Sequence, residues 1–320
     1  MPRVMVFMLV SLAVCSAMAS LPALTFVLAV GWGISLLTGG LYLTRKQVAL
    51  VAGVNILLLY FLTGSNSMFF YLGFFGLPFI VMSLFAADEA QGYYDILKRG
   101  IMAGIIGVSL FMGLIYLSTG GVGIAQLEEQ LDNYFEESWQ QYEKSGAMDF
   151  YEQKGIASEE LKAQIDGFVH TTARHLPSFF YLESICAVFL VVYLTARICR
   201  RKKLQRLIKK PFSEEIMPWQ VAWVVIAGLA LWLLGKDNNP VIYLAGSNIL
   251  IVCIPITVYF GLSALTYKVN RINGPARKGI ILILLLLGIF LILSVIIFLA
   301  MLGLFDSLID YRKLRSPKEE

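Results

Sequence analysis

Three polar residues stand inside long apolar stretches of the sequence, and their side chains are the best placed to do chemistry. Glu183, Asn55 and Asn248 are each surrounded by apolar residues. A charged side chain costs about 2.5–3.5 kcal/mol at the centre of a bilayer on insertion scales, unless it faces the protein interior. Glu183 therefore either binds a cation, a proton or a polar ligand in a cavity, or reaches the membrane interface past Tyr181. Asn55 and Asn248 are further ligand-binding candidates, although amides in helix bundles usually hydrogen-bond neighbouring helices.

Residues with catalytic chemistry do not occur at the spacings that catalysis requires. Asp306 and Asp310, near Gly303, could join Asp95 as the paired acids of an intramembrane protease, in which two carboxylates share a proton. The topology derived below places Asp95 and Asp306 near opposite faces of the membrane, and the second glycine of that pattern is missing. No Ser, His and Asp set and no HExxH pattern is available. We expect no catalytic residues, and a membrane enzyme stays a minor alternative.

The His and Cys residues do not predict a metal site. His170 and His175 are five residues apart, and this spacing does not put two imidazoles on one helical face as well as a spacing of four. The cysteines all lie in or beside apolar stretches and form no CxxC pair, being Cys15, Cys186, Cys199 and Cys253. We expect no metal, no disulfide framework and no cofactor.

The composition assigns the chain to the membrane. Hydrophobic residues make up 58% and charged residues 15% of its 320 residues, with a mean hydropathy of +0.72. Soluble domains contain roughly 45–50% apolar and about 25% charged residues. The net charge of +4 comes from basic residues at the ends of apolar stretches, which indicates membrane orientation and not a nucleic-acid partner.

Nine apolar runs have the length of a transmembrane helix, which needs about 20 residues. They are approximately residues 4–19, 22–43, 48–64, 68–86, 100–119, 177–196, 219–235, 241–266 and 279–304. The expected fold is an all-α transmembrane helix bundle of about eight or nine spans. Its parts are five spans in residues 1–119, an acidic extracytoplasmic helical insert at 120–176, a sixth span at 177–197, a basic cytoplasmic connector at 198–217, the C-terminal spans at 218–304 and a polar tail at 305–320.

A basic run from Arg197 to Lys210 sets the orientation, because Lys and Arg near span ends stay on the cytoplasmic side. Its anchoring residues directly after the sixth span are Arg197, Arg200, Arg201, Lys202 and Lys203. Counting back from this run places Lys98–Arg99, Arg45–Lys46 and the N-terminus with Arg3 in the cytoplasm. Counting forward leaves Arg312, Lys313 and Arg315 outside, against the rule. One of the last three segments is therefore expected to be re-entrant, or the tail to lie on the outer interface.

The N-terminal run has a second interpretation. Arg3, an apolar stretch and Ala17-Met18-Ala19 also fit a cleavable signal peptide covering residues 1–19. Both interpretations place Ser20 outside.

The insert at residues 120–176 is acidic and helical in pattern. It holds eleven of the 22 acidic residues and four Lys or Arg. Apolar residues at spacings of three and four predict two or three short helices. They form either a solvated linker, or a lid or partner-binding element.

Several short motifs resemble the YybS-like family of bacterial membrane proteins, whose function is not established. They are Leu21-Pro22, Leu176-Pro177, Pro211-Phe212-Ser213-Glu214, Met217-Pro218-Trp219, Ser247-Asn248, Gly261-Leu262, Gly303 to Ser307 and Tyr311-Arg312-Lys313. The resemblance implies a multi-pass protein of the bacterial cytoplasmic membrane. It also implies likeness in hydropathy to the substrate-binding subunits of energy-coupling-factor transporters, whose first helix contacts a coupling subunit through small residues. Ala13 and Ala17 would form such a face, or a helix-packing face.

Two functions follow as the main expectations. The first is transport-related binding of a small-molecule solute in a cavity between helices, with or without a coupling subunit. The second is a non-transporting membrane partner or scaffold in envelope or signalling processes, which would use the acidic insert. The lipid bilayer is the one partner that the sequence itself indicates.

Overall fold

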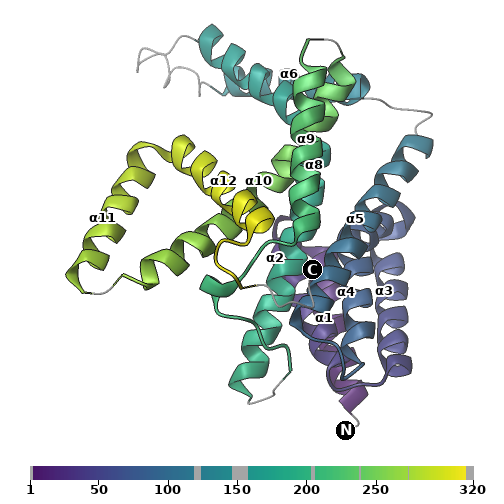
Figure 1. Ribbon diagram of the computed structural model, residues 1–320. Coiled ribbons are helices and arrows are strands. Elements are labelled where there is room, and N and C mark those ends of the chain that lie inside the picture. The colour runs from purple at the N-terminus through teal and green to yellow at the C-terminus, as the bar shows by residue number, and fades with distance from the viewer. Residues whose placement is uncertain are drawn as a thin grey trace. The chain divides into compact units, whose positions relative to one another are not determined.

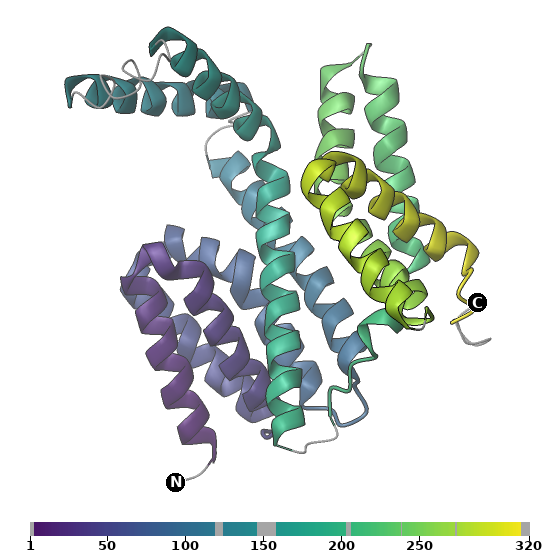
Figure 2. The same ribbon diagram turned by 90° about the vertical axis from the view of Figure 1, so that its left-hand side faces the viewer.

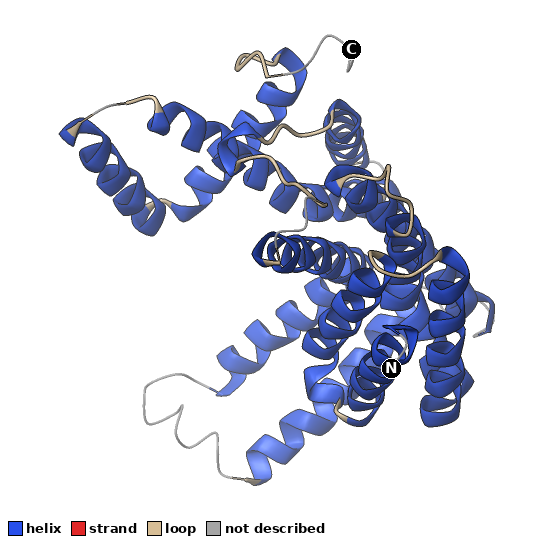
Figure 3. Cartoon of the chain, turned by 90° about the horizontal axis from the view of Figure 1, so that it is seen from below, coloured by secondary structure: helices blue, strands red, loops and turns tan. Residues whose placement is uncertain are grey.

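The computed structural model describes residues 3–118, 124–145, 158–202, 206–237, 239–272 and 274–314. Every regular element in these ranges is helical, which confirms the expected all-α fold (Figures 1 and 3). The chain divides into two compact units, residues 1–209 and 210–320. The division falls at the end of the basic run, and each unit is described by itself.

The first unit contains α1 (Arg3–Ser20), η1 (Pro22–Leu24), α2 (Thr25–Gly40), α3 (Arg45–Tyr71), the π-helix η2 (Leu72–Gly76), α4 (Leu77–Ala86), α5 (Tyr93–Ser118), α6 (Ile124–Lys144) and α8 (Ser158–Arg201). The second contains η3 (Phe212–Glu214), α9 (Trp219–Gly235), α10 (Pro240–Asn270), α11 (Pro275–Phe290) and α12 (Ile292–Ile309). Seven helical segments in the described ranges are long and apolar enough to cross a membrane, and α9 is a shorter apolar helix.

Residues 45–86 form two passes, as the sequence analysis expects. Gly64 interrupts α3 with φ 73° and ψ 177°, a conformation that residues with a Cβ atom rarely adopt. The chain turns back there, since Arg45 at the start of α3 and Asp88 just after α4 form an ion pair of 3.2 Å.

Arg206 fastens the end of the first unit to its other helices. Its guanidinium donates hydrogen bonds to the carbonyl oxygens of Leu41 (3.1 Å), Ala86 (2.7 Å) and Asp88 (3.0 Å). The last carbonyls of a helix lack partners inside that helix, so these bonds satisfy acceptors at or just beyond the ends of α2 and α4. The chain segments near residues 41, 86 and 206 therefore meet at one end of the unit.

Other contacts bring the N-terminus and further basic residues to the same end. The Phe7 ring in α1 stacks on Tyr42 with centroids 5.9 Å apart, and the Arg99 guanidinium lies 3.7 Å from the centre of the Phe85 ring. The first of the six passes thus starts, and the sixth finishes, at the same end of the unit. This is the alternation that the distribution of Lys and Arg predicts.

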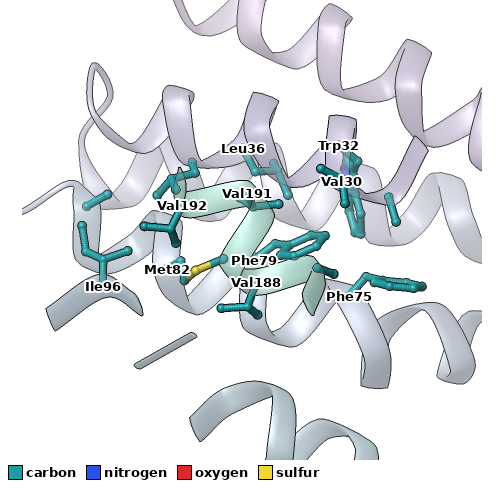
Figure 4. Close-up of a cluster of buried hydrophobic side chains, with 14 of the residues drawn as sticks. Val30, Trp32, Leu36, Phe75, Phe79, Met82, Ile96, Val188, Val191 and Val192 are labelled. Atoms are coloured by element: carbon teal, nitrogen blue, oxygen red, sulfur yellow. The ribbon is translucent and has the colours of Figure 1, made fainter. Parts of the chain in front are cut away.

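The core of the first unit lies between α2, α4, α5 and α8. Trp32, Phe79 and Met82 are fully buried there with Val188 and Val191, and Figure 4 shows their side chains gathered between the helices. The helices approach closely at glycines: a Cβ atom on Gly107 would lie 2.2 Å from a backbone oxygen of η2. Small residues that allow such close approach are typical of helix packing in membranes.

Helix α8 runs without interruption from the insert into the sixth span. The expected span starts at Pro177, but the helix already begins at Ser158 and continues to Arg201. Proline removes one backbone hydrogen bond without necessarily ending a helix in a membrane, because neighbouring groups satisfy the freed carbonyl. In Figure 2 the teal helix α8 extends past the spans and runs beside α6.

The ninth span is not one helix, and this part of the prediction is wrong. The expected run at 279–304 is divided between α11 and α12 by Leu291, whose φ of −126° and ψ of 44° are not helical. Apolar runs reveal length but not a break, and no proline marks this one. Packing explains the direction of α12, because its Gly303 and Leu299 backbones contact Thr257 and Gly261 of α10.

The C-terminal residues return to the end of the second unit at which α9 begins. Ser307 donates a hydrogen bond to the Met217 carbonyl (3.0 Å), and Arg312 donates to the Ser213 and Glu215 carbonyls, both at 2.7 Å. The tail and the residues that follow Lys210 therefore lie together. A single ninth span would have separated them.

Candidate functional site

Asn55 is fully buried and joins the first three helices. Its Oδ1 accepts a hydrogen bond from Trp32 Nε1 (3.0 Å), and its Nδ2 donates to Ser11 Oγ (2.9 Å) and to the Val51 carbonyl (2.8 Å). The amide oxygen and both amide N–H groups are thus used by α1, α2 and α3. This is the helix-to-helix bonding that the sequence analysis gives as the usual role of such amides.

Glu183 lies near the middle of the first unit. The next residue, Ser184, donates a hydrogen bond of 2.8 Å to the carbonyl of Phe74, which is ten residues after Gly64 and twelve before Ala86. The Glu183 side chain is partly buried, and no hydrogen-bond or ion-pair partner for its carboxylate is found among the described residues. A charge at this depth without a partner is costly, which marks it as a functional candidate.

The backbone opposite Ser184 is unusual. Phe74 belongs to η2, a π-helix of five residues. Such π-turns are rare and are often found at functional sites. About one turn earlier in α8, the hydroxyls of Tyr181 and Ser109 are 2.8 Å apart and link α8 to α5. Polar groups therefore surround the level of Glu183 on α8.

Asn248 belongs to the second unit, in α10. Its Nδ2 donates to the Leu244 carbonyl of the same helix at 2.8 Å, and the side chain is partly buried. The structure places Glu183 and Asn55 in the first unit and Asn248 in the second, so no shared site of the three is described.

Helix α1 packs into its unit through one face only. Ser11, Cys15 and Met18 are buried on that face, whereas Ala13 is exposed and Ala17 is partly exposed. Ala13 therefore lies outside the contact that α1 makes with the rest of the chain.

The basic anchoring residues lie at the C-terminal end of α8, where their positive charge is favourable. Arg200 and Arg201 occupy the last turn of α8, where a positive charge favours the carbonyl end of the helix dipole. Arg197 also lies in α8 and Lys202 directly follows it, whereas Lys203 falls outside the described residues.

A buried polar cluster in the second unit escaped the sequence analysis. Arg312 is 5% exposed and Asp306 is 1% exposed, and the two form an ion pair with nitrogen-to-oxygen distances of 2.5–3.0 Å. Arg312 also donates to Ser263 Oγ at 3.2 Å, and Tyr259 donates to the Glu215 carboxylate. The sequence offered one signal of this cluster. Counting nine spans places Arg312 outside the membrane, against the positive-inside rule.

The structure also shows how α6 and α8 are paired in the insert. Lys162 of α8 binds Glu136 of α6 at 2.9 Å, and this hydrogen-bonded pair raises the pKa of Lys162. Trp139 is 4% exposed and lies in the same contact, with Lys162 Nζ 6.0 Å from its ring centre. The expected helices of the insert thus pack against the extension of a span.

A small cavity in the first unit lies beside α1, α2 and α3. Its volume of about 10 Å³ is room for about one water molecule. Its lining is mainly apolar and comprises Phe7, Ser35, Leu36, Gly39, Leu43, Val48 and Val51. This cavity is too small for an organic solute.

One family model matches nearly the whole chain, over residues 7–307, and its description is "Predicted membrane protein (DUF2232)". The chain belongs to the DUF2232 family. As a DUF2232 protein with seven membrane-length helical segments, it is a multi-pass membrane protein. The match supports a family of membrane proteins without a stated activity. It supports neither the resemblance to the YybS-like family nor the likeness to transporter subunits. No curated protein and no solved structure matches this DUF2232 chain.

Proposed function

We propose that this protein is a non-enzymatic, transport-related membrane protein that binds a small cationic solute at Glu183. The carboxylate without a partner near mid-membrane supports this function, because a bound cation would neutralise a charge that otherwise costs about 2.5–3.5 kcal/mol at that depth. The π-helix and the Ser184 hydroxyl lie at the same level. The solute would bind beside α8, which in this unit also contacts α2, α5 and, in the insert, α6.

Ligand-dependent thermal unfolding of the purified full-length protein in lipid nanodiscs tests this proposal. We expect at least one amine from a metabolite panel to raise the melting temperature, because a ligand at 100 times its Kd stabilises the native state by about 2.7 kcal/mol. Glu183→Gln should abolish the shift, and Glu183→Asp should retain part of it.

Cys186→Ala is the matched control, since Cys186 is an exposed residue on the same helix. The control should respond to the amine as the wild type does. A wild-type protein that no compound stabilises, or a shift that survives Glu183→Gln, would contradict the proposal.

Exposed aromatic side chains favour a second candidate function, that of a partner-binding scaffold. Tyr134 and Tyr142 on α6 and Phe168 on α8 are 70%, 59% and 71% exposed. These residues lie on the insert, and α8 continues from the insert into a span. Large exposed aromatic residues are enriched where proteins bind one another.

Photo-crosslinking in cells separates the two candidates. A crosslinker at position 134 or 168 should give one discrete adduct if the insert binds a protein, while a crosslinker at Glu137 serves as a control on α6. Adducts that persist after Glu183→Gln would assign them to the scaffold function. Absence of any adduct at 134 and 168 would count against it.

The exposed face of α1 offers a place for a membrane partner such as a coupling subunit. Ala13→Leu enlarges a residue that makes no buried contact in the chain, so the bundle should stay intact. Loss of co-purification with a membrane partner in this variant, but not in Ala23→Leu, an exposed residue of η1, would support that partner. Unchanged co-purification would remove Ala13 from the interface.

A further inference from the structure

Three potential metal ligands meet between α6 and α8 in the insert. Asp132 comes from α6, and Asp166 and His170 come from α8. Asp166 and His170 are four residues apart, so they share one face of the helix. The Nε2 atom of His170 is 3.6 Å from Asp132 Oδ1 and 3.8 Å from Asp166 Oδ1.

The pairing of the two helices brings these residues together. Lys162 binds Glu136 one turn away, and a step of four residues forward on α8 and back on α6 leads to Asp166 and Asp132. The helices are thus antiparallel with a fixed register here. The ligand set is a product of that register, because no single helix holds more than two of its members.

The distances are near those of a coordination sphere. All three ligand atoms lie within 4.8 Å of one another. A tetrahedral ion with bonds of about 2.1 Å to nitrogen and oxygen places its ligand atoms roughly 3.4 Å apart. Two of the separations here exceed that value by only a few tenths of an ångström, which side-chain rotation can supply.

The Asp132 carboxylate oxygen in this cluster lacks a hydrogen-bond donor. Its Oδ1 atom is out of contact with solvent and accepts no hydrogen bond, although the side chain as a whole is 37% exposed. A buried carboxylate oxygen without a donor is costly. The same atom is the one that faces His170 Nε2, so a cation between them would remove the deficit.

We propose that Asp132, Asp166 and His170 bind one divalent transition-metal ion, which fastens α6 to α8. One imidazole and two carboxylates suit Zn²⁺ or Mn²⁺ better than Ca²⁺, which prefers six to eight oxygen ligands. Three protein ligands leave at least one coordination position for water or another ligand. This inference concerns the insert alone and is independent of solute binding at Glu183.

The competing explanation is an ion pair in which a protonated His170 is held by two carboxylates. His170→Lys separates the two, because lysine keeps the positive charge and can still pair with Asp132 and Asp166, whereas it removes the imidazole ligand. Asp166→Asn is a second variant that removes a ligand without removing the histidine.

Full-length protein in nanodiscs, purified with a tag that contains no histidine and freed of metal with a chelator, is titrated with Mn²⁺. Binding is followed by loss of the electron paramagnetic resonance signal of free Mn²⁺ and, for Zn²⁺, by calorimetry. We expect one ion per chain in the wild type and at least a tenfold weaker affinity in His170→Lys and Asp166→Asn. Far-ultraviolet circular dichroism verifies that each variant is folded.

Two variants serve as controls. His175→Ala removes the other histidine of the chain, and Glu137→Gln neutralises an exposed carboxylate of α6. Both should bind Mn²⁺ as the wild type does. The proposal is overturned if the wild type binds no ion, if His170→Lys binds as tightly as the wild type, or if His175→Ala loses binding to the same extent.

Discussion

At the scale of single residues, the Asn55 amide joins three helices of the first unit. Asn55→Leu would leave Trp32 Nε1 without its acceptor and Ser11 Oγ without a donor, while keeping an apolar side chain of similar size. Interhelical hydrogen bonds in membranes average about 0.6 kcal/mol, with a maximum of about 1.7. Because two such bonds are lost, we expect a decrease of about 1–3 kcal/mol in the free energy of unfolding.

Thr63→Val is the control for that measurement. The Thr63 hydroxyl is on the same helix and donates to the Leu59 carbonyl within it. Unfolding in a titration with denaturing detergent should show a smaller change for Thr63→Val than for Asn55→Leu. Equal changes in the two variants would mean that the bonds to Trp32 and Ser11 add nothing to stability.

The buried pair of Arg312 and Asp306 gives the second prediction at this scale. Removing one partner of a buried ion pair typically costs about 3–5 kcal/mol, because the other charge is left uncompensated. Arg312→Met should therefore lower the unfolding temperature strongly. Asp306→Leu added to Arg312→Met should restore part of the loss.

The neighbouring Lys313 is exposed, and Lys313→Met should change stability by less than about 0.5 kcal/mol. Thermal unfolding of all four proteins in the same detergent measures the series. A double variant less stable than Arg312→Met alone would contradict the proposed compensation of charge.

Sequence reasoning found the polar residues that lie within apolar stretches but not those that depend on the fold. Asn55 and Glu183 could be picked out because their neighbours in the chain are apolar. The hydrogen-bond partners of Arg312 come from η3, α10 and α12, so no local sequence pattern predicts them. The ligand atoms of Asp132 and His170 likewise meet only through the register of two helices.

At the scale of elements, the contact between α5 and η2 depends on a glycine. A Cβ atom on Gly107 would lie 2.2 Å from the backbone oxygen of Gly73, and backbone cannot move as a side-chain end can. We expect Gly107→Ala to separate the two elements and to lower the unfolding temperature.

Gly113→Ala is the matched change in the same helix. Nothing lies within 4 Å of a Cβ atom at that position, and alanine is favoured over glycine in a helix by roughly 0.5–1 kcal/mol. The unfolding temperature should stay the same or rise. A decrease similar to that of Gly107→Ala would show that close packing is not the cause.

The sequence predicted the number and position of most helices, since length and hydropathy are local properties. The expected span at 219–235 coincides with α9, and the turn at Gly64 falls where the expected span at 48–64 ends. It did not predict the break at Leu291, beyond which α12 packs on α10, because contacts between helices are not a local property of the sequence. Pro177 was taken for the start of a span although the helix continues through it.

At the scale of the whole molecule, the contacts of Arg312 and Ser307 determine which side of the membrane the tail occupies. They hold the tail at the start of α9, on the side that follows Lys210. Arg312 and Lys313 therefore lie beside the residues that follow Lys210, an arrangement that agrees with the positive-inside rule. We expect a cysteine at Lys313 and one at Glu214 to react from the same side of the membrane.

The measurement uses protein whose four native cysteines have been replaced, with a membrane-impermeant maleimide applied to oriented vesicles. Lys236→Cys, just beyond the far end of α9, should react from the opposite side. If Lys313→Cys reacts with Lys236→Cys and not with Glu214→Cys, the tail lies across the membrane as a nine-span count would have it.

The position of Arg206 in the chain has a consequence for biogenesis. The helix ends that its guanidinium binds were synthesised more than a hundred residues earlier, at Leu41 and Ala86. During translation the Arg206 guanidinium can bind these carbonyls only after all six passes of the first unit have been synthesised. The donor and its three acceptors all lie within residues 41–206, so the first unit can form these bonds before any residue of the second unit has been synthesised.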